Sequence, residues 1–413
     1  MENSLTEMPN FNALRTDRPL DGRRILIIVE NLPLPFDRRV WHECLTLTAA
    51  GADVSVICPK GKGYEARHEE LEGVHIYRHS LPLDADSTFG YMIEYGAALF
   101  HEMRLALTVA WRHGFDTIHG CNPPDLIFLI ALPFKLFGKR FIFDHHDINP
   151  ELYTAKFNRR GFFWKLMLLL ERLTFRTADV VISTNNSYRD IAITRGSKAP
   201  QDIFVVRSGP NLSRLTVMEP AEHWKNRRDH MVGYVGVMGD QEGIDLLLEA
   251  ARIIVHDRGQ DVQFVLVGSG PSFDALQEMA ANMGLANHVT FTGRVPDHDL
   301  FEVLSTADVC VNPDRVNAMN DKSTMNKILE YMAFSKPIVQ FDVTEGRFSA
   351  GESSLYAKPN DTDDLADKIL ALLSDPEARD RMGKIGRKRV ESELNWDHQV
   401  QPLIAAYQRA LKA

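Results

Sequence analysis

The chain has 413 residues, more than one hydrophobic core usually serves, so two domains are expected. Its apolar fraction of 44% and charged fraction of 25% are typical of globular proteins and argue against disorder or fibres. The net charge of −9 excludes the broad electrostatic attraction on which nucleic-acid binders depend, so no nucleic acid is expected as a partner.

The beginning of the chain is acidic and polar, with no apolar stretch before Ile25, and predicts neither a signal peptide nor a membrane anchor. The longest apolar run, residues 126–137, is interrupted by Pro133 and falls short of the roughly 20 residues that span a bilayer. We expect an ordinary buried helix there. Four cysteines without metal-type spacing predict reduced core thiols of a cytoplasmic protein: Cys44, Cys58, Cys121 and Cys310.

Short β-branched runs alternate with helix-length periodic segments along the whole chain, which is the pattern of a parallel sheet covered by helices. In the first half, strands are predicted at residues 24–29, 54–58, 74–77, 117–119, 140–143, 180–183 and 203–206. Helices are predicted between them, among others at residues 38–50, 124–137 and 162–176.

The second half repeats this architecture. Its strands are predicted at residues 231–235, 264–267, 289–291, 309–311 and 338–341. The predicted fold class is α/β, with two Rossmann-like, doubly wound parallel-sheet domains facing each other across a cleft. The predicted parts are an N-terminal extension (1–22), a first domain (23–210), a linker (211–229), a second domain (230–395) and a C-terminal helix that crosses back to the first domain (396–413).

Four titratable side chains follow the predicted strand at residues 140–143, namely Asp144, His145, His146 and Asp147. Clustering such groups is costly without a use, and histidine is the side chain best suited to handling protons near neutral pH. His146 and Asp147 are therefore candidate catalytic residues. A metal site is the competing interpretation, but no second cluster of ligands accompanies this one, so no metal is expected.

A strongly basic segment covers residues 156–198, with nine basic and three acidic side chains in an acidic protein. It surrounds Phe162-Phe163-Trp164 and the apolar run at residues 166–170. Such a segment fits an anionic membrane surface as a partner. A helix packed on the core with solvated basic flanks fits it equally well.

The loop after the first strand of the second half contains Gly236 and Gly239 and leads into a predicted helix at residues 244–255. Glycines at such a turn let backbone N–H groups approach a phosphate, helped by the start of the helix. A plain tight turn is an equally good interpretation, because the spacing is not that of a dinucleotide fingerprint.

The most informative block begins at Lys322. Ser323 or Thr324 can cap a helix whose free N–H groups would hold a diphosphate, with Lys322 and Lys327 adding positive charge. Glu330, further along this helix, could accept hydrogen bonds from ribose hydroxyls. A capped surface helix with one carboxylate explains the same residues equally well.

The segment Asp361-Thr362-Asp363 looks like the aspartate pair with which other transferases hold a metal-bound nucleotide. It directly precedes an amphipathic run at residues 365–373. We therefore interpret it as the capped, acidic start of a helix.

Several blocks, in this order, resemble the family-4 glycosyltransferases, which have the two-domain GT-B fold and retain anomeric configuration. These blocks are residues 24–29, 45–58, 265–271, 289–295, 307–309 and 327–333, followed by Lys336-Pro337. The resemblance covers nearly the whole chain. It implies a retaining glycosyltransferase of the hexosyltransferase type, with an acceptor-side first domain and a donor-binding second domain.

The implied reaction moves a sugar from a nucleotide diphosphate sugar to a hydroxyl acceptor, lipid-linked or saccharide, in surface polysaccharide or glycolipid synthesis. No cofactor or bound metal is expected. The implied location is the cytoplasm, peripheral at the inner face of the plasma membrane. A catalytically silent nucleotide-sugar-binding subunit and a sugar-nucleotide epimerase of the same architecture are the alternatives.

Roles follow from the resemblance by position. Glu330 would bind the donor ribose, His146 would lie near the transferring sugar, and Val295 would border the base pocket. Arg38 and Arg39 would border donor and acceptor. The full set of expected donor-binding residues is Glu330, Lys322, Ser323, Thr324, Met325, Lys327, Gly236, Gly239, Val295 and Arg315.

The family pattern is not intact at the expected phosphate site. Lys322 stands where the family has its first paired glutamate. The Arg and Lys of the loop after the first strand of the second domain are replaced by Val237 or Met238 and by Glu242. We expect Lys322, together with Arg315, to supply the missing positive charge.

Overall fold

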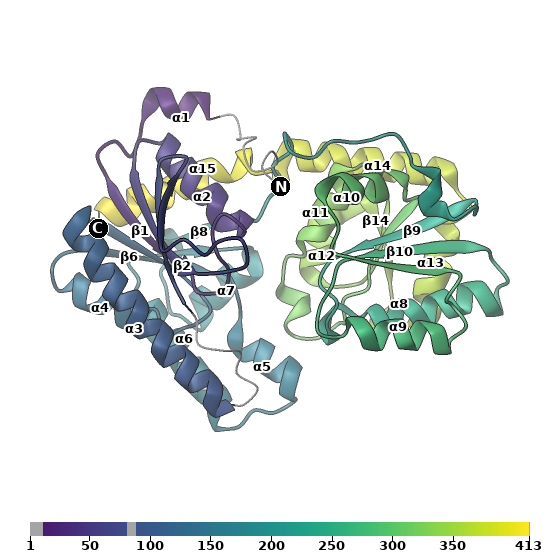
Figure 1. Cartoon of the computed structure of the whole chain (residues 1–413), viewed down its shortest axis with the longest axis horizontal. Helices are drawn as coiled ribbons and strands as arrows, with labels where there is room; N and C mark the ends of the chain where they lie inside the picture. Colours follow the sequence, from purple (N-terminus) through teal and green to yellow (C-terminus); the bar gives the residue numbers. More distant parts are fainter. Residues whose placement is uncertain (1–10, 81–87, 413) are drawn as a thin grey trace. The chain divides into compact units, whose positions relative to one another are not determined.

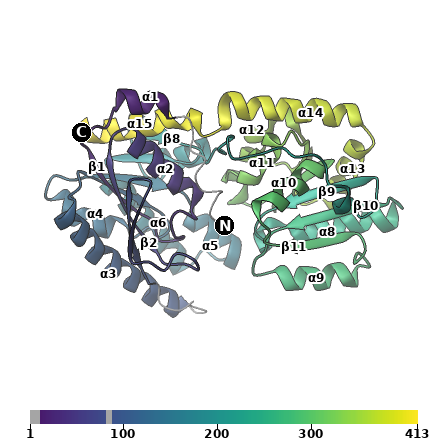
Figure 2. The same cartoon turned by 45° about the horizontal axis from the view of Figure 1, so that its top comes forward.

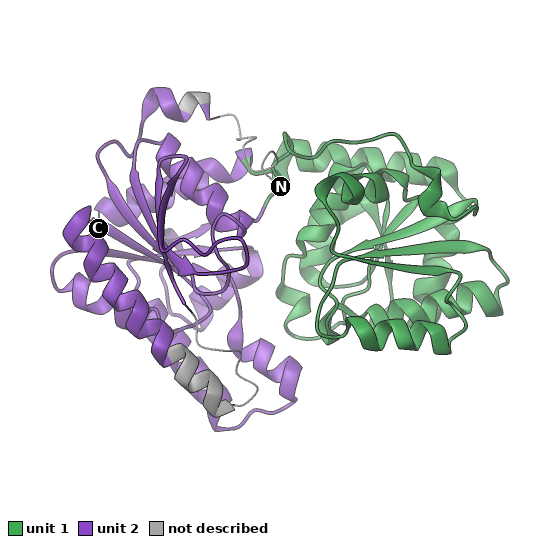
Figure 3. Ribbon diagram, viewed as in Figure 1, with its two compact units in different colours: residues 1–7, 209–396 green, residues 8–208, 397–413 purple. Residues whose placement is uncertain are grey.

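The computed structural model describes residues 11–80 and 88–412 and divides into two compact units, coloured separately in Figure 3. The unit called here the N-terminal domain comprises residues 8–208 and 397–413, and the C-terminal domain contains residues 209–396. Each is built on its own parallel or nearly parallel sheet, which confirms the predicted α/β class with two doubly wound domains.

The N-terminal domain has an eight-stranded sheet in the order β3-β4-β2-β1-β5-β6-β7-β8. Only the edge strand β3 pairs antiparallel, with β4. The strands are β1 (Arg24–Ile28), β2 (Asp53–Pro59), β3 (His68–Leu71), β4 (Val74–His79), β5 (Thr117–Cys121), β6 (Arg140–His145), β7 (Val180–Ser183) and β8 (Ile203–Val205).

The helices of this domain cover the sheet (Figure 1). They are α1 (Asn12–Asp17), α2 (Arg38–Ala49), α3 (Thr88–Arg112), α4 (Phe128–Lys135), α5 (Asn149–Phe157), α6 (Phe162–Thr177), α7 (Asn186–Thr194), a 3-10 turn (Pro200–Asp202) and α15 (Asp397–Lys412). The side chains of Cys44, Cys58 and Cys121 here, and of Cys310 in the other domain, are buried and free, as expected for reduced core thiols.

The C-terminal domain has a six-stranded, all-parallel sheet in the order β11-β10-β9-β12-β13-β14. Its strands are β9 (His230–Val235), β10 (Val262–Val267), β11 (Val289–Gly293), β12 (Val309–Asn312), β13 (Ile338–Phe341) and β14 (Ser354–Ala357). Its α-helices are α8 (Ile244–Arg252), α9 (Phe273–Asn282), α10 (Asp297–Thr306), α11 (Asn326–Ala333), α12 (Thr344–Ala350), α13 (Thr362–Leu373) and α14 (Pro376–Arg389). Short 3-10 turns are Glu222–Lys225, Asp240–Glu242, Asn320–Lys322 and Gly351–Ser353, and short π-helical segments are Ile253–Asp257 and Val390–Leu394.

Alternation along the strands gives this second sheet a core on each face. On β10, Phe264 and Leu266 pack with α8, α9 and α13, while Val265 and Val267 pack with α10 and α11. Successive strand side chains point to opposite faces, so strands buried on both sides read as continuous apolar runs. That is why β10 was recognisable from the sequence.

Three connecting segments are held by apolar contacts. Phe11, Leu14 and Leu20, before β1, are buried in the N-terminal domain. Leu212 and Trp224, within the segment expected as a linker, pack against the core of the C-terminal domain. At the other end of the chain, α15 leaves the C-terminal domain and packs against β6, β7 and β8.

One face of the N-terminal domain is apolar and exposed. It is formed by the outer sides of α3, α4 and α6, which lie side by side in both views (Figures 1 and 2). Ten of the sixteen large apolar side chains exposed among the described residues lie on or directly after these helices: Phe100, Leu107, Trp111, Leu129, Leu132, Leu136, Phe137, Phe162, Phe163 and Leu169. We call this surface the apolar helix face.

The expectation of an ordinary buried helix at residues 126–137 is therefore wrong for its outer side. Ile130 and Phe134 do pack inward, but Leu136 and Phe137 are 82% and 80% exposed. Lys135 is the one polar residue in this run, and a single polar position does not define a period, so periodicity could not separate the two faces. Among the residues the structure describes, no helix combines the length and apolar character needed to cross a bilayer.

Candidate functional site

In both sheets, the strand order places a crevice where consecutive connections run in opposite directions. These points lie between β1 and β5 in the N-terminal domain and between β9 and β12 in the C-terminal domain. Ligands of open α/β sheets bind beyond the carboxyl ends of the strands at such points. The candidate ligand-binding residues are therefore those that follow β1, β5 and β6 in the first sheet and β9 and β12 in the second.

The four titratable residues at the end of β6 do not form one group. Asp144 and His145 lie on the strand, and alternation sends them to opposite faces of the sheet. The ring of His145 is buried among Phe143, Phe175 and Tyr188. Burial, followed by the charge of Arg195, lowers the pKa of His145 to about 3, so it is a neutral core histidine.

Asp144, in contrast, is the centre of a polar cluster with Arg39, Glu43, His119 and His146, which we call the β6 cluster. Arg39 reaches both oxygens of the fully buried Asp144, at 3.0 and 3.2 Å. Nε2 of His146 lies 2.6 Å and Nε2 of His119 lies 3.3 Å from Oδ2 of Asp144. Arg39 also contacts Glu43, one helical turn later, at 3.1 Å.

Two contacts hold the imidazole ring of His146 in place. Nε2 lies 3.0 Å from Nε of Arg39, which can only donate, and 2.6 Å from the Asp144 carboxylate, which can only accept. The ring is thereby held in one orientation between the guanidinium and the carboxylate.

The two buried carboxyl groups of the cluster are held in different states. Burial alone would raise the pKa of Asp144, but the charges of Arg39 and His146 and hydrogen bonds from both histidines hold it well below its usual range. Burial and the charge of Asp144 raise the pKa of Glu43 well above its usual range. Asp144 is therefore ionised and Glu43 protonated, which leaves one carboxylate opposite one guanidinium.

The loop after β6 is fastened by Asn122, which directly follows β5. Its Oδ1 accepts from the backbone N–H groups of His146 and Asp147, at 2.6 and 3.1 Å, and its Nδ2 donates to the Asp147 carbonyl at 2.7 Å. Burial raises the pKa of Asp147, which His146 opposes. Asn122 thus determines where the His146 backbone lies.

Several residues of this site were not singled out from the sequence: Glu43, His119, Asn122 and Tyr407. Tyr407 on α15 places its hydroxyl 2.6 Å from Nδ1 of His119. Only Asn122, a polar residue just after a strand, carried a sequence signal of the kind used for His146. The others are buried residues on helices and strand interiors, and their partners lie up to 288 positions away.

The β6 cluster also contains possible metal ligands. Ligand atoms of Glu43, Asp144 and His146 lie within 4.8 Å of one another, as do those of His119, Cys121 and Asp144. The guanidinium of Arg39, however, already neutralises the Asp144 carboxylate and also contacts Glu43. A metal ion there would face a fixed cation.

In the C-terminal domain, the glycine loop after β9 is closed on its neighbour. The backbone N–H groups of Gly236 and Met238 donate to the carbonyls of Val267 and Ser269, at 3.0 and 3.2 Å. A Cβ at Gly268 would lie 1.8 Å from the Gly236 carbonyl oxygen, so the two loops need glycine for their close approach. These two amides serve the fold and are not available for phosphate.

The helix expected to receive a diphosphate is α11, and it begins at Asn326 with Met325 as the N-cap. The expected capping by Ser323 or Thr324 is wrong, because the chain is still extended at these positions and Ser323 instead donates to the Met319 carbonyl at 2.9 Å. No side-chain hydrogen bond caps α11. The first N–H groups of a helix have no acceptor within the helix, so those of α11 can donate hydrogen bonds to an anion.

In the first turn of α11, the Lys327 side chain is held by an ion pair with Asp314. Its Nζ lies 2.7 Å from Oδ1 of the buried Asp314, which follows β12, and 5.1 Å from the centre of the Tyr234 ring. Burial raises the pKa of Asp314 although Lys327 opposes this, and burial and Asp314 raise the pKa of Glu242. Much of the Lys327 charge is thus compensated within the protein.

The remaining expected donor residues lie around this point. Arg315 binds the Asp240 carbonyl at 3.0 Å and forms an ion pair with Asp245. Nζ of Lys322 lies 3.5 Å from the Ala318 carbonyl. Glu330 is half-buried in α11, and Val295 follows β11 and packs against the core.

The two acceptor-side arginines differ. Arg38, the first residue of α2, is exposed. Arg39 points into the β6 cluster, where it contacts Asp144, Glu43 and His146, and it also donates to the Val206 carbonyl at 2.8 Å. The prediction for Asp361 is confirmed: it caps α13 by accepting from the Asp364 N–H at 3.0 Å.

Comparison with known proteins agrees with this geometry. Residues 37–209 match the "Glycosyl transferase 4-like domain" and residues 229–375 match "Glycosyl transferases group 1". The two matches together cover more than three quarters of the chain. They fall on the N-terminal and the C-terminal domain respectively.

Individual relatives point the same way. The alpha-D-kanosaminyltransferase of Streptomyces kanamyceticus is 31% identical over 156 residues, which is 37% of this chain and 39% of the relative. The structure of a sucrose-phosphate synthase from Thermosynechococcus elongatus is similar with a TM-score of 0.78 and 20% identity, covering 94% of this chain and 98% of that chain. Anabaena HepE, solved with UDP and glucose, has a TM-score of 0.67 at 14% identity, with 91% and 97% covered.

The likeness in fold thus extends over nearly the whole chain, although the matched part spans well under half of the kanosaminyltransferase. Both domain matches are glycosyltransferase families and the kanosaminyltransferase is a glycosyltransferase, while the two solved structures show the same fold. The chain therefore belongs to the family-4-type glycosyltransferases of GT-B fold.

Proposed function

We propose that this glycosyltransferase moves a sugar, with retention of configuration, from a nucleotide diphosphate sugar to a hydroxyl group of a lipid-linked saccharide. The observation that carries the catalytic part is the β6 cluster, in which Asp144 and Arg39 hold the His146 ring in one orientation. A reaction that breaks a glycosidic bond to a diphosphate needs such a preorganised polar group beside the sugar.

The C-terminal domain supplies the donor site in this proposal. The start of α11, which no side chain caps, receives the diphosphate, and Lys322, the last residue of the turn before it, supplies positive charge nearby. Glu330 accepts hydrogen bonds from the ribose, and Val295 borders the base. A leaving diphosphate gains negative charge, which a helix start and a cation stabilise.

His146 positions the reacting sugar through Nδ1, and Asp147 acts beside it. Arg39 contributes by fixing Asp144 and His146 and not by touching the acceptor, since its donors are used within the cluster. Arg38, the exposed neighbour, is the acceptor-side arginine in this proposal.

The first experiment identifies the donor. Purified protein is heated with UDP, GDP and ADP and their sugar conjugates, and the nucleotide that raises the melting temperature is then used in transfer assays with NMR detection of the anomeric configuration. We expect one nucleotide to stabilise and the product to keep the donor's configuration. An inverted product contradicts retention, and epimerised donor without acceptor identifies the epimerase.

The second experiment tests the β6 cluster. His146→Gln keeps a side-chain donor for Asp144 but removes the imidazole, so we expect kcat to fall by about 10² or more, with unchanged melting temperature. His256→Gln, at an exposed position of the C-terminal domain, is the matched control. Full activity of His146→Gln would refute the role of His146, and binding of the nucleotide without turnover in the wild type would identify a silent subunit.

The third experiment addresses Lys322. We expect Lys322→Ala to weaken nucleotide diphosphate binding by about tenfold, as the loss of a partly exposed cation near a diphosphate implies. The corresponding nucleoside, which has no phosphate, provides the comparison. Unchanged diphosphate affinity would show that the start of α11 suffices without this lysine.

The lipid-linked acceptor rests on the apolar helix face. The described side chains of its three helices include two acidic residues, Glu102 and Glu171, and both are buried. Its exposed charged residues are basic: Arg104, Arg112, Lys165, Arg172 and Arg176. Exposed aromatic and basic side chains, with no exposed acid among the described side chains of these helices, are suited to an anionic membrane surface, where rings enter the headgroup region.

Vesicle flotation tests this membrane contact. We expect the protein to float with vesicles containing anionic lipid and much less with purely zwitterionic ones. Trp111→Glu with Phe137→Glu should abolish flotation, while Val217→Glu, an exposed position of the C-terminal domain, should not. Indifference to lipid charge would refute the proposed surface without affecting the transferase assignment.

A further inference from the structure

Two histidines and an aspartate meet at the amino end of the N-terminal sheet. Asp53 is the first residue of β2, His75 is the second residue of β4, and His113 directly follows α3. The carboxyl ends of these parallel strands, where the β6 cluster lies, are at the opposite edge of the sheet. The glycosyltransferase site does not use this group.

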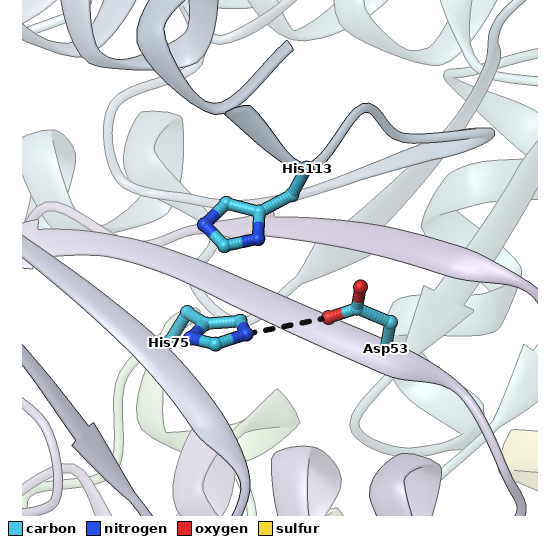
Figure 4. Close-up of side chains that lie close together, drawn as sticks. All are labelled: Asp53, His75 and His113. Carbon is cyan, nitrogen blue, oxygen red and sulfur yellow. Dashed lines mark ion pairs between the residues drawn. The ribbon is translucent and has the colours of Figure 1, made fainter. Parts of the chain in front are cut away.

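The three side chains converge (Figure 4). The His75 ring turns one nitrogen toward the carboxylate of Asp53, and a nitrogen of His113 faces the same carboxylate. Nε2 of His75 lies 3.8 Å from Oδ1 of Asp53, and one ligand atom of each residue lies within 4.8 Å of the others. The two rings are stacked, with centroids 4.2 Å apart.

These separations are close to those of a metal site. Zinc binds histidine nitrogen and carboxylate oxygen at about 2.0–2.2 Å, so tetrahedral ligand atoms are roughly 3.3 Å apart. Binding would therefore require the side chains to rotate toward one another, and all three residues are at least partly exposed. A set of two imidazoles and one carboxylate suits zinc and neighbouring transition metals and leaves a fourth position for water.

An outer contact orients one of the two rings for such binding. The hydroxyl of Tyr77 lies 2.8 Å from Nε2 of His113. A proton on this outer nitrogen, donated to the hydroxyl oxygen, leaves the lone pair of His113 on Nδ1, the nitrogen that faces Asp53 in Figure 4. Metal-binding histidines are typically fixed in this way by an oxygen on the far nitrogen.

We propose that Asp53, His75 and His113 bind one divalent transition-metal ion of the zinc class, with Tyr77 orienting His113. The ion would join the starts of β2 and β4 to the end of α3, three segments that are distant in sequence. It would stabilise the N-terminal domain, and sugar transfer would proceed without it.

The test uses the full chain, freed of metal with a chelator. Zinc is titrated by calorimetry, and cobalt by its visible absorption, which reports the coordination geometry. We expect one strong equivalent, tetrahedral cobalt bands and a higher melting temperature with zinc. His75→Gln and His113→Gln should each lose this equivalent, and Tyr77→Phe should bind about tenfold more weakly.

Controls separate this site from others. His298→Gln removes a histidine from an exposed acidic group in the C-terminal domain, and should keep the strong equivalent. Equal melting temperatures of wild type and His113→Gln in the presence of chelator establish that the variant is folded. The proposal is overturned if His75→Gln and His113→Gln bind cobalt with wild-type stoichiometry and affinity, or if the wild type binds none.

Discussion

At the scale of single residues, the N-terminal domain contains two histidines with opposite roles at adjacent positions. His146 is tied to the ionised Asp144, whereas His145 is enclosed by aromatic rings with a pKa lowered to about 3. Strand alternation alone produces this difference, because it sends neighbouring side chains to different faces. Adjacent identical residues can thus serve the site and the core respectively.

The buried His145 makes stability depend on pH. Its pKa is about 3 in the folded protein and about 6.5 when unfolded, so between these values the unfolded chain binds more protons and stability falls as pH falls. We expect His145→Leu to reduce the dependence of unfolding free energy on pH between about 6.5 and 4, by up to roughly 1.4 kcal/mol per pH unit. Urea unfolding at several pH values measures this, with His256→Gln as the control. A slope identical to that of the wild type would contradict it.

Tyr407 provides a second prediction at this scale. Nε2 of His119 donates to Asp144, so Nδ1 accepts from the Tyr407 hydroxyl. Tyr407→Phe would leave this buried nitrogen without its partner, at a cost of about 1–3 kcal/mol in unfolding free energy. Tyr153→Phe, on the partly exposed α5, should cost less than about 0.5 kcal/mol. Chemical denaturation compares them, and equal effects would speak against the assigned hydrogen bond.

At the scale of elements, the ends of the helices decide what each one does. The start of α11 has no side-chain cap and is suited to an anion, while α13 is closed by Asp361. Both follow loops rich in polar residues, so composition alone does not distinguish them. The difference lies in whether a carboxylate or hydroxyl occupies the position directly before the helix.

The capping of α13 is directly testable. Asp361→Ala removes the acceptor for the Asp364 N–H, and we expect a loss of about 1 kcal/mol in the unfolding free energy of the C-terminal domain. Asp363→Ala, within the first turn, removes a similar charge but not the cap, and should cost less. Two variants of equal stability would indicate that charge alone matters there.

Single elements also show which structural features can be predicted from the sequence alone. The apolar strands β1, β10 and β12 and the cap of α13 follow from local pattern, because burial on both faces and capping are local properties. The sequence pattern predicts the start of α11 too early, because Ser323 and Thr324 are good caps in isolation. In the structure a 3-10 turn at Asn320–Lys322 precedes them, and the helix begins only at Asn326. Asp144 and His146 were recognisable after a strand, but Glu43 and His119 depend on contacts across the sheet, which no local pattern encodes.

At the scale of the whole molecule, the chain crosses between its domains twice. It passes from the N-terminal to the C-terminal domain near residue 208 and returns near residue 397, so α15 completes the first domain with residues from the end of the chain. Buried contacts such as Gln399 Oε1 with the Arg207 N–H, at 2.9 Å, depend on this return. The first domain is therefore incomplete in sequence until the last residues are present.

This topology predicts different behaviour of the two isolated domains. We expect a fragment of residues 209–396 to unfold cooperatively, because both of its cores are complete. A fragment of residues 8–208 lacks α15 and should be unstable until a peptide of residues 397–413 is added. Circular dichroism with urea tests both. A stable 8–208 fragment that ignores the peptide would show that α15 is dispensable.

The burial of all four cysteines has a practical consequence. Burial raises the pKa of the Cys58 thiol to about 11 and that of Cys310 to about 12, and Cys44 and Cys121 are fully enclosed. Maleimide dyes react with accessible thiolate, so the native chain should remain unlabelled. A single cysteine introduced on each domain would then carry a fluorophore without prior removal of the natural thiols, and energy transfer between the dyes could follow domain movement during turnover.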